Sequence, residues 1–190
     1  MTESEGVPTA RLRASERCCD FYVERASTDL TVAEIAEAAG VSQRTFYRYF
    51  PTKAESLSPV FDWTTAEFNS AIAAASPDAS LTDALGQAFR AAFGESKADR
   101  TRALFPLVFA DMEMWSVFLR KVHDGERSLA HVLTPRLGLD IDDLSARAAA
   151  ASVASATRIA LEVMVTNGSD PEHVYAQMID AFTTGTIRRR

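Results

Sequence analysis

The chain has 190 residues, of which 47% are hydrophobic and 24% are charged, so it can bury a core and is not a disordered tail. Its net charge of −6 argues against a protein that coats nucleic acid without regard to sequence. Its apolar runs are far shorter than a membrane span and its polar start, MTESEGVPTAR, lacks a secretory signal, so we expect a cytoplasmic protein without a membrane partner.

The segment over residues 9–25, which follows the polar residues 1–8, has the apolar periodicity of an amphipathic helix. The apolar positions that share one face are Ala14, Cys18, Phe21 and Tyr22. The neighbours Cys18 and Cys19 project roughly 100° apart on such a helix, a poor arrangement for a disulfide bond or a metal. We expect reduced thiols in or beside the core, and a redox-sensing pair is the alternative.

Two short helices joined by a tight turn are predicted next. Thr31 and Glu34 have the spacing of a capping box at the start of the first helix. Gly40 suits the left-handed conformation that ends a helix, and Ser42 can cap a second helix over residues 43–50. This arrangement predicts a helix-turn-helix, a motif that places its second helix in the major groove of DNA.

The second helix carries side chains suited to DNA. Residues 38–54 contain no Asp or Glu, and Phe46 and Phe50 are spaced to anchor the helix to the core. We predict that Gln43 and Arg44 reach base edges, because Gln suits adenine and Arg suits guanine. Other predicted DNA-binding residues lie nearby, and most of them are expected to contact the phosphate backbone. They are Thr31, Ser42, Thr45, Tyr47, Arg48, Tyr49 and Lys53.

Over about residues 10–58 the chain resembles the TetR family of transcriptional regulators. The resemblance rests on Thr31-Val32, Ile35-Ala36, Ala39-Gly40-Val41-Ser42, Thr45-Phe46-Tyr47, Tyr49-Phe50-Pro51 and Lys53. It implies a three-helix DNA-binding domain, a larger helical ligand domain, and a homodimer that a ligand releases from a palindromic operator. The chain departs from the family at Ala26, where glycine is common, and at Leu30-Thr31, where paired threonines are common.

The rest of the chain stays helical, and no segment alternates long enough to predict a strand. We expect further helices over residues 53–75 with a restart at Pro59, over 80–96 capped by Ser80 with Asp83, over 99–134 with a candidate break at Asp124-Gly125, from Asp140 or Asp142 to Asn167, and over 171–184. The predicted fold class is all-α, with a helix-turn-helix domain over residues 1–55 and a ligand-binding and dimerisation domain over residues 56–190.

The middle of the chain is rich in large, soft side chains, which either fill the core or line an apolar cavity. The candidates for lining a ligand cavity are Trp63, Phe89, Phe93, Phe105, Phe109, Met112, Trp115 and Phe118. Residues 100–106 and the alanine-rich helix after them are weakly similar to the TetR branch with acyl-CoA-like ligands, a similarity that identifies no ligand. We expect a small, largely apolar effector.

Small side chains over residues 140–166 allow a helix to approach a neighbour closely. This helix either packs against its symmetry mate or lies buried within one subunit. The resemblance favours the dimer, because TetR regulators dimerise through their last two long helices. The predicted interface residues are Ala150, Val153, Ala154, Thr157, Met178 and Phe182.

Two other classes of protein compete with a regulator. An enzyme is disfavoured because the scattered His123, His131 and His173 form no metal-binding pair, and the sequence has neither a glycine-rich phosphate loop nor a nucleophile elbow. A protein-binding helical module would not need an acid-free helix with outward Gln and Arg side chains. We therefore predict a repressor without catalytic residues, metal or cofactor, although operator position decides between repression and activation.

Overall fold

The computed structural model describes residues 9–184, and every structural statement below refers to them. Within this range the chain forms helices and no strand, which confirms the predicted all-α fold. The α-helices are α1 Ala10–Arg25, α2 Val32–Ala38, α3 Gln43–Tyr49, α4 Ser58–Ala74, α5 Leu81–Phe93, α6 Ala98–Ala110, α7 Met112–Leu137, α8 Leu144–Asn167 and α9 Pro171–Thr184. Two short 3-10 helices, η1 Ala54–Leu57 and η2 Glu95–Lys97, precede α4 and α6.

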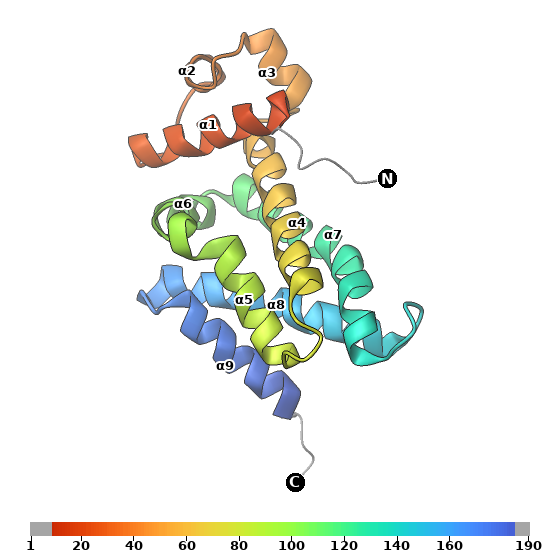
Figure 1. The fold of residues 1–190 in the computed structure, drawn as a ribbon. Helices are drawn as coiled ribbons and strands as arrows, with labels where there is room; N and C mark the ends of the chain where they lie inside the picture. The colour runs from red at the N-terminus through yellow and green to blue at the C-terminus, as the bar shows by residue number, and fades with distance from the viewer. Residues whose placement is uncertain (1–8, 185–190) are drawn as a thin grey trace.

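The first three helices lie at one end of the molecule, and α4 runs from that end into the body formed by α5 to α9 (Figure 1). One buried hydrophobic cluster joins α1, α2 and α3 to η1, α4, α6, α7 and the C-terminal part of α8. A second cluster fills the space between α4, α5, α7, α8 and α9. The three N-terminal helices therefore share a continuous core with the body.

Local hydrogen bonds set most helix boundaries where the sequence predicts them. Thr31 and Glu34 form the expected capping box at the start of α2. The hydroxyl of Ser42 accepts the N–H of Thr45 at 3.2 Å, and that of Ser80 accepts the N–H of Asp83 at 3.1 Å. These caps satisfy N–H groups that have no partner within their own helices.

Two predicted boundaries are wrong. α7 passes through residues 124–125 without a break, and the break lies earlier, at Asp111, whose carboxylate accepts the N–H groups of Glu113 and Met114 at 3.0 and 3.1 Å. Gly125 instead allows close packing, since a Cβ there would lie 3.2 Å from Cγ2 of Thr65 on α4. At the start of α8 the cap is Asp143, rather than Asp140 or Asp142.

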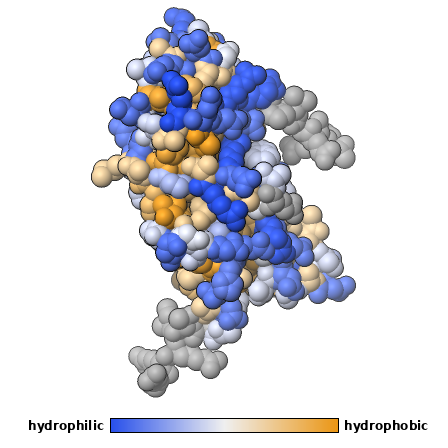
Figure 2. Space-filling model, turned by 90° about the vertical axis from the view of Figure 1, so that its left-hand side faces the viewer, coloured by the Kyte–Doolittle hydropathy of each residue, from blue (hydrophilic) through white to orange (hydrophobic). Residues whose placement is uncertain are grey.

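By length and composition alone, α8 could cross a membrane. In this fold α8 packs against α7 and α9, and its buried residues belong to the two core clusters. Core helices of folded proteins share such composition, so the finding is weak evidence for a membrane span. On the face in Figure 2, hydrophobic side chains gather at mid-height among hydrophilic ones.

Candidate DNA-binding surface and effector cavity

The turn between α2 and α3 has the geometry of a helix-turn-helix. Gly40 takes the left-handed conformation, with φ of 70°. Its N–H donates to the carbonyl of Glu37 at 2.9 Å, and the N–H of Val41 donates to the carbonyl of Ala36 at 2.9 Å. These bonds close the end of α2 and direct the chain at once into α3.

α3 is anchored by two aromatic side chains and presents its other face outward. Phe46 and Phe50 are fully buried, with ring centroids 5.1 Å apart. Gln43 and Arg44 are exposed, and neither has a hydrogen-bond or ion-pair partner among the described residues. Tyr47, 54% exposed, lies on the same helix. The two side chains predicted to read bases, Gln43 and Arg44, are therefore accessible to DNA.

The other predicted phosphate contacts differ in how far they are already engaged. Arg48 is exposed, with its guanidinium 5.3 Å from the ring centre of the half-buried Tyr49. The hydroxyl of Ser42 donates to that of the half-buried Thr45 at 3.1 Å. The ammonium of Lys53 donates to the carbonyl of Thr28 at 2.7 Å, which leaves two of its three N–H donors.

Thr31 serves the structure of α2 rather than an open surface. Its N–H and hydroxyl both donate to the carboxylate of Glu34, at 2.8 and 2.7 Å. These two bonds lower the pKa of Glu34, and the nearby Arg25, 4.0 Å away, lowers it further. A phosphate accepts hydrogen bonds, so the Thr31 hydroxyl can donate to one only by leaving Glu34.

Arg17 braces the turn, a role that the sequence did not indicate. Its guanidinium, which lies on α1, donates to the carbonyl of Ala39 at 3.3 Å. A Cβ added to Gly40 would lie only 2.7 Å from the same guanidinium nitrogen. Glycine is therefore favoured at position 40 by its backbone conformation, and a side chain there would also displace the guanidinium of Arg17.

Buried polar groups connect α1 to η1, the segment that follows the helix-turn-helix of α2 and α3 (the reading helices). The hydroxyl of Ser15 donates to the carbonyl of Ser56 at 2.5 Å, and the hydroxyls of Tyr22 and Ser56 lie 3.2 Å apart. Cys18 and Cys19 are free and fully buried in this region. Burial raises the pKa of Cys18 to about 12 and that of Cys19 to about 11, so both thiols stay protonated and poorly reactive near neutral pH.

A cavity of about 70 Å³ lies among α4, α7, α8 and the end of α5. Its lining is Phe61, Thr64, Thr65, Phe68, Asn69, Phe93, Phe118, Lys121, Val122, Gly125, Leu129, Ala154 and Thr157. Of the eight residues predicted to line a ligand cavity, only Phe93 and Phe118 do so. The sequence did not indicate the polar part of the wall, because large apolar side chains, the sequence signal for a cavity, do not reveal hydroxyl and amide groups.

The other six predicted residues lie elsewhere. Phe89 stacks on Tyr175 with ring centroids 4.4 Å apart, and Phe105 packs in the core between Phe61 and Phe118. Such mutual ring contacts fill the space that a cavity would need. The remaining four are half-buried or exposed: Phe109 and Trp115 pack together, Trp63 lies beneath the ammonium of Lys97, and Met112 is 83% exposed.

A second recess, of about 1030 Å³, lies between α7 and α8. Charged and imidazole side chains of both helices and of the loop between them line it, among them His123, Arg127, His131, Asp142 and Arg147. This lining differs in character from the apolar cavity and includes none of the predicted ligand-binding residues. Among the described residues, no group of three or more His, Cys, Asp or Glu could hold a metal ion.

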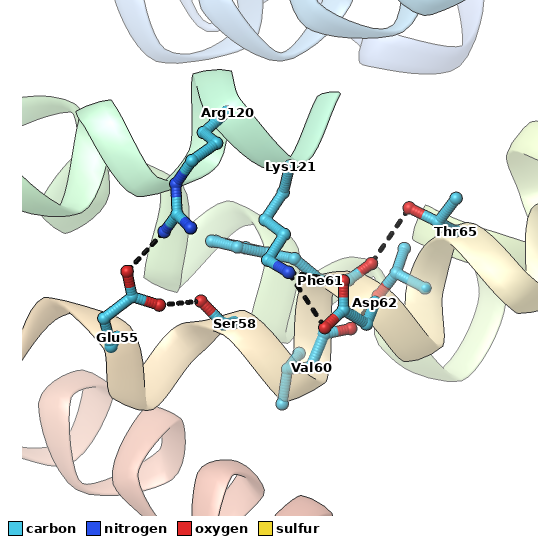
Figure 3. A network of polar contacts seen from close by, with 9 residues as sticks. Glu55, Ser58, Val60, Phe61, Asp62, Thr65, Arg120 and Lys121 are labelled. Atoms are coloured by element: carbon cyan, nitrogen blue, oxygen red, sulfur yellow. Dashed lines mark hydrogen bonds and ion pairs between the residues drawn. The ribbon is translucent and has the colours of Figure 1, made fainter. Parts of the chain in front are cut away.

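Ion pairs tie α7 to the segment that leads into the reading helices (Figure 3). Arg120 of α7 pairs with Glu55 of η1, and Glu55 also accepts the hydroxyl of Ser58 at 2.5 Å. About one turn further along α4 than Ser58, Asp62 pairs with Lys121 of α7 at 2.8 Å. Because Lys121 also lines the cavity, this network lies between the cavity and η1.

The residues predicted to form a dimer interface divide into two groups. Ala150, Val153 and Ala154 are buried against the chain's own α5, α7 and α9, so their side chains have no surface left for a second copy. Thr157 is half-buried and lines the cavity. On α9, Met178 is half-buried and Phe182 is 40% exposed, so these two remain accessible.

Comparisons with known proteins agree with this geometry. Residues 23–57 match the sequence profile described as bacterial regulatory proteins, tetR family. The chain is 29% identical over 133 residues to the HTH-type transcriptional regulator TcmR of Streptomyces glaucescens; the match spans 65% of this chain and only 58% of that protein.

Solved structures of low sequence identity share the fold. A tetR-family transcriptional regulator from Streptomyces coelicolor is 15% identical with a TM-score of 0.62, over 94% of this chain and 81% of that one. Thermus thermophilus FadR, a TetR-family repressor solved with lauroyl-CoA, is 19% identical with a TM-score of 0.62, over 95% of this chain and 96% of that one. At these identities the likeness concerns the fold alone.

Proposed function

We propose that the chain is a transcriptional regulator of the TetR family, a cytoplasmic repressor that binds a palindromic operator as a homodimer and that a small, largely apolar effector releases. In this proposal residues 1–55 read DNA, residues 56–190 bind the effector and form the dimer, and the chain has no catalytic role, cofactor or metal. The observation that carries the proposal is the outward, unpartnered pair Gln43 and Arg44 on the anchored helix α3.

Within α3, the two ends take different roles. Gln43 and Arg44 stand in the first turn, the part of a recognition helix that meets base edges. Tyr47 and Arg48 follow and supply a hydroxyl and a guanidinium for phosphate oxygens, and Lys53 adds the ammonium donors left by its bond to Thr28. The exposed carboxylate of Glu34 carries a negative charge beside this surface, which favours a DNA face limited to the turn and α3.

Dimerisation supplies the affinity that one small basic surface lacks. With a net charge of −6, a single subunit has no broad electrostatic attraction to DNA. The half-buried residues Ala151, Ser155 and Ile159 recur every four positions along α8, and we assign them, with Met178 and Phe182 of α9, to the contact with a second copy. This face replaces the buried positions that the sequence indicated.

Release by an effector follows from the position of the cavity. A ligand seated between α4 and α7 displaces α4 relative to α7, and Asp62 and Glu55 carry the ion pairs that hold these segments together. Since Ser56 of η1 is hydrogen bonded to Ser15 and Tyr22 of α1, movement of η1 carries the reading helices with it. In a dimer this changes the spacing of the two reading heads.

The experiment measures binding to duplex DNA that covers the chain's own upstream region, across a salt series. We expect an even number of subunits per site and an affinity that falls on the order of a thousandfold between about 50 and 200 mM salt. The double variant Arg44→Ala, Tyr47→Phe should lose at least about tenfold in affinity, whereas Arg127→Ala, an exposed arginine of α7, should not. Wild-type binding by the double variant would exclude α3 as the reading helix.

A further inference from the structure

A hydrogen-bond chain fixes the orientation of the Asn69 amide at the cavity wall. The hydroxyl of Ser128 donates to the carbonyl of Gly125 at 2.9 Å, so its oxygen can accept. The amide nitrogen of Asn69 donates to that oxygen at 3.0 Å. The other amide atom, Oδ1, is buried and has no hydrogen-bond partner. Asn69 and Gly125 both line the cavity, so an unsatisfied acceptor, covered by its surroundings, lies on a residue of the wall.

The hydroxyls of the cavity wall are also acceptors. Thr64, Thr65 and Thr157 donate their protons to the main-chain carbonyls four residues earlier, at 2.8, 3.0 and 3.1 Å. A hydroxyl that has donated its proton retains only lone pairs for a further partner. Asn69, Thr64 and Thr65 can therefore accept a hydrogen bond without giving up one that they already make, whereas the oxygen of Thr157 faces the buried hydroxyl of Tyr175.

The single cation of the wall is already neutralised. Lys121 is the one charged residue among those that line the cavity, and its ammonium pairs with Asp62 at 2.8 Å. A carboxylate ligand would face acceptor oxygens and would compete with Asp62 for Lys121. The wall therefore disfavours an anion.

We infer that the cavity takes an uncharged, mainly apolar ligand that donates a hydrogen bond, from a hydroxyl or an N–H group, to Asn69 Oδ1. The donor satisfies the buried acceptor, and the rings of Phe61, Phe68 and Phe118 cover the apolar body. The inference rests on the proposed function, because it names the chemical class of the effector.

The volume of the cavity links binding to movement of α4. At about 70 Å³ it is about half of the roughly 150 Å³ apolar cavity that accommodates benzene. A ligand with one aromatic ring is therefore fully enclosed only if the cavity widens. The close contact between Gly125 of α7 and Thr65 of α4 lies at this wall, so widening separates the two helices there.

The test compares three ligands of similar size, phenol, toluene and benzoate, for binding to the full chain without DNA, by calorimetric titration and ligand-observed NMR. Phenol carries the donor, toluene lacks it, and benzoate is an anion. We expect phenol to bind about tenfold more tightly than toluene and benzoate not to bind. Equal affinity for phenol and toluene, or tighter binding of benzoate, would overturn the inference.

Two variants assign the preference to one atom. Asn69→Leu removes the acceptor and should bring the ratio of phenol to toluene affinity close to one. Ser128→Thr is the matched control, since it keeps the hydroxyl that holds the amide nitrogen and leaves Oδ1, and it should keep phenol the tighter ligand. An unchanged ratio in Asn69→Leu contradicts the inference. These titrations contain no DNA, so their failure leaves the DNA-binding proposal intact, and failure of DNA binding leaves them unaffected.

Discussion

At the residue scale, Ala26 carries a backbone conformation that its side chain disfavours. It ends α1 with φ of 48° and ψ of 35°, and it is the only non-glycine residue with positive φ among residues 9–184. Its N–H donates to the carbonyl of Val23 at 3.1 Å, so the conformation is held by the end of the helix. The left-handed region brings Cβ close to the following carbonyl and costs about 1–2 kcal/mol, which glycine avoids.

Replacing Ala26 with glycine should therefore stabilise the protein. Glycine loses about 0.4–1 kcal/mol more backbone entropy on folding, so we expect a net gain of about 0.5–1 kcal/mol in the free energy of unfolding, measured by urea denaturation. The matched control is Ala66→Gly, at an exposed position inside α4, which should lower stability by about 1 kcal/mol. A loss of stability in both variants would contradict the account of Ala26.

The buried thiols give stability a dependence on alkaline pH. Burial raises the pKa of Cys18 from 9.0 to about 12 and that of Cys19 from 9.0 to about 11. Below pH 9 the thiols are protonated in both the folded and the unfolded chain, so their contribution is fully present. Above pH 9 the unfolded chain loses these protons first, and the contribution is lost as pH rises through the folded values.

We expect the free energy of unfolding, measured in the presence of a reductant, to fall between pH 9 and 11. The double variant Cys18→Ala, Cys19→Ala should show a smaller fall over the same range, whatever its stability at pH 7. Burial also raises the pKa of Tyr22, so part of the fall should remain in the variant. Identical pH profiles for the two proteins would show that the thiols do not contribute.

At the element scale, the joint between α2 and α3 depends on one glycine. Gly40 and Gly138 have nearly the same conformation, with φ of 70° and 64°. A Cβ at Gly40 would meet the guanidinium of Arg17 at 2.7 Å, whereas a Cβ at Gly138 would have nothing within 4 Å. The two positions therefore share the backbone penalty and differ in the steric one.

Gly40→Ala should destabilise the protein more than Gly138→Ala. The backbone term is about 1–2 kcal/mol in both, and the loss of the bond from Arg17 to the carbonyl of Ala39 adds about 1 kcal/mol at position 40. Thermal unfolding measures both, and DNA affinity should fall only for Gly40→Ala, because only this joint positions α3. Equal effects of the two substitutions on both measurements would exclude a role for Arg17.

Local sequence predicted where the helices begin and end better than it predicted which neighbours each helix face contacts. The caps at Thr31, Ser42 and Ser80 could be predicted because each bond joins groups three residues apart. Gly125 was misread as a helix break, because its role depends on Thr65, 60 positions away in the chain. The cavity wall combines side chains from four helices, so no local pattern could single out Asn69.

At the scale of the whole molecule, the proposed recognition of a palindromic operator requires a second copy of the chain. The dimer prediction from sequence placed Ala150, Val153 and Ala154 at the interface because they are small, but packing against other helices of the same chain buries them. Which face of α8 remains open depends on where α7 and α9 pack. The sequence periodicity of α8 alone does not predict where its neighbours lie. Ile159 lies on the side that stays half-buried in the single chain.

Ile159→Arg should convert the dimer to a monomer in sedimentation experiments, because a guanidinium buried between two copies would lack a partner. Operator affinity should fall at the same time, since one reading head has too few contacts. Met112→Arg is the matched control, as Met112 is 83% exposed at the start of α7 and the substitution is equally polar. A dimeric Ile159→Arg protein with normal affinity would place the interface elsewhere.

The central claim is that two copies of the chain read DNA through Gln43 and Arg44. Selection of bound duplexes from a random-sequence library tests it most directly, because it presupposes neither the operator nor the effector. We expect a palindromic consensus bound by an even number of subunits, and in Arg44→Ala a relaxed preference at one base pair of each half-site. Absence of any enriched sequence, or an identical consensus in Arg44→Ala, would contradict it.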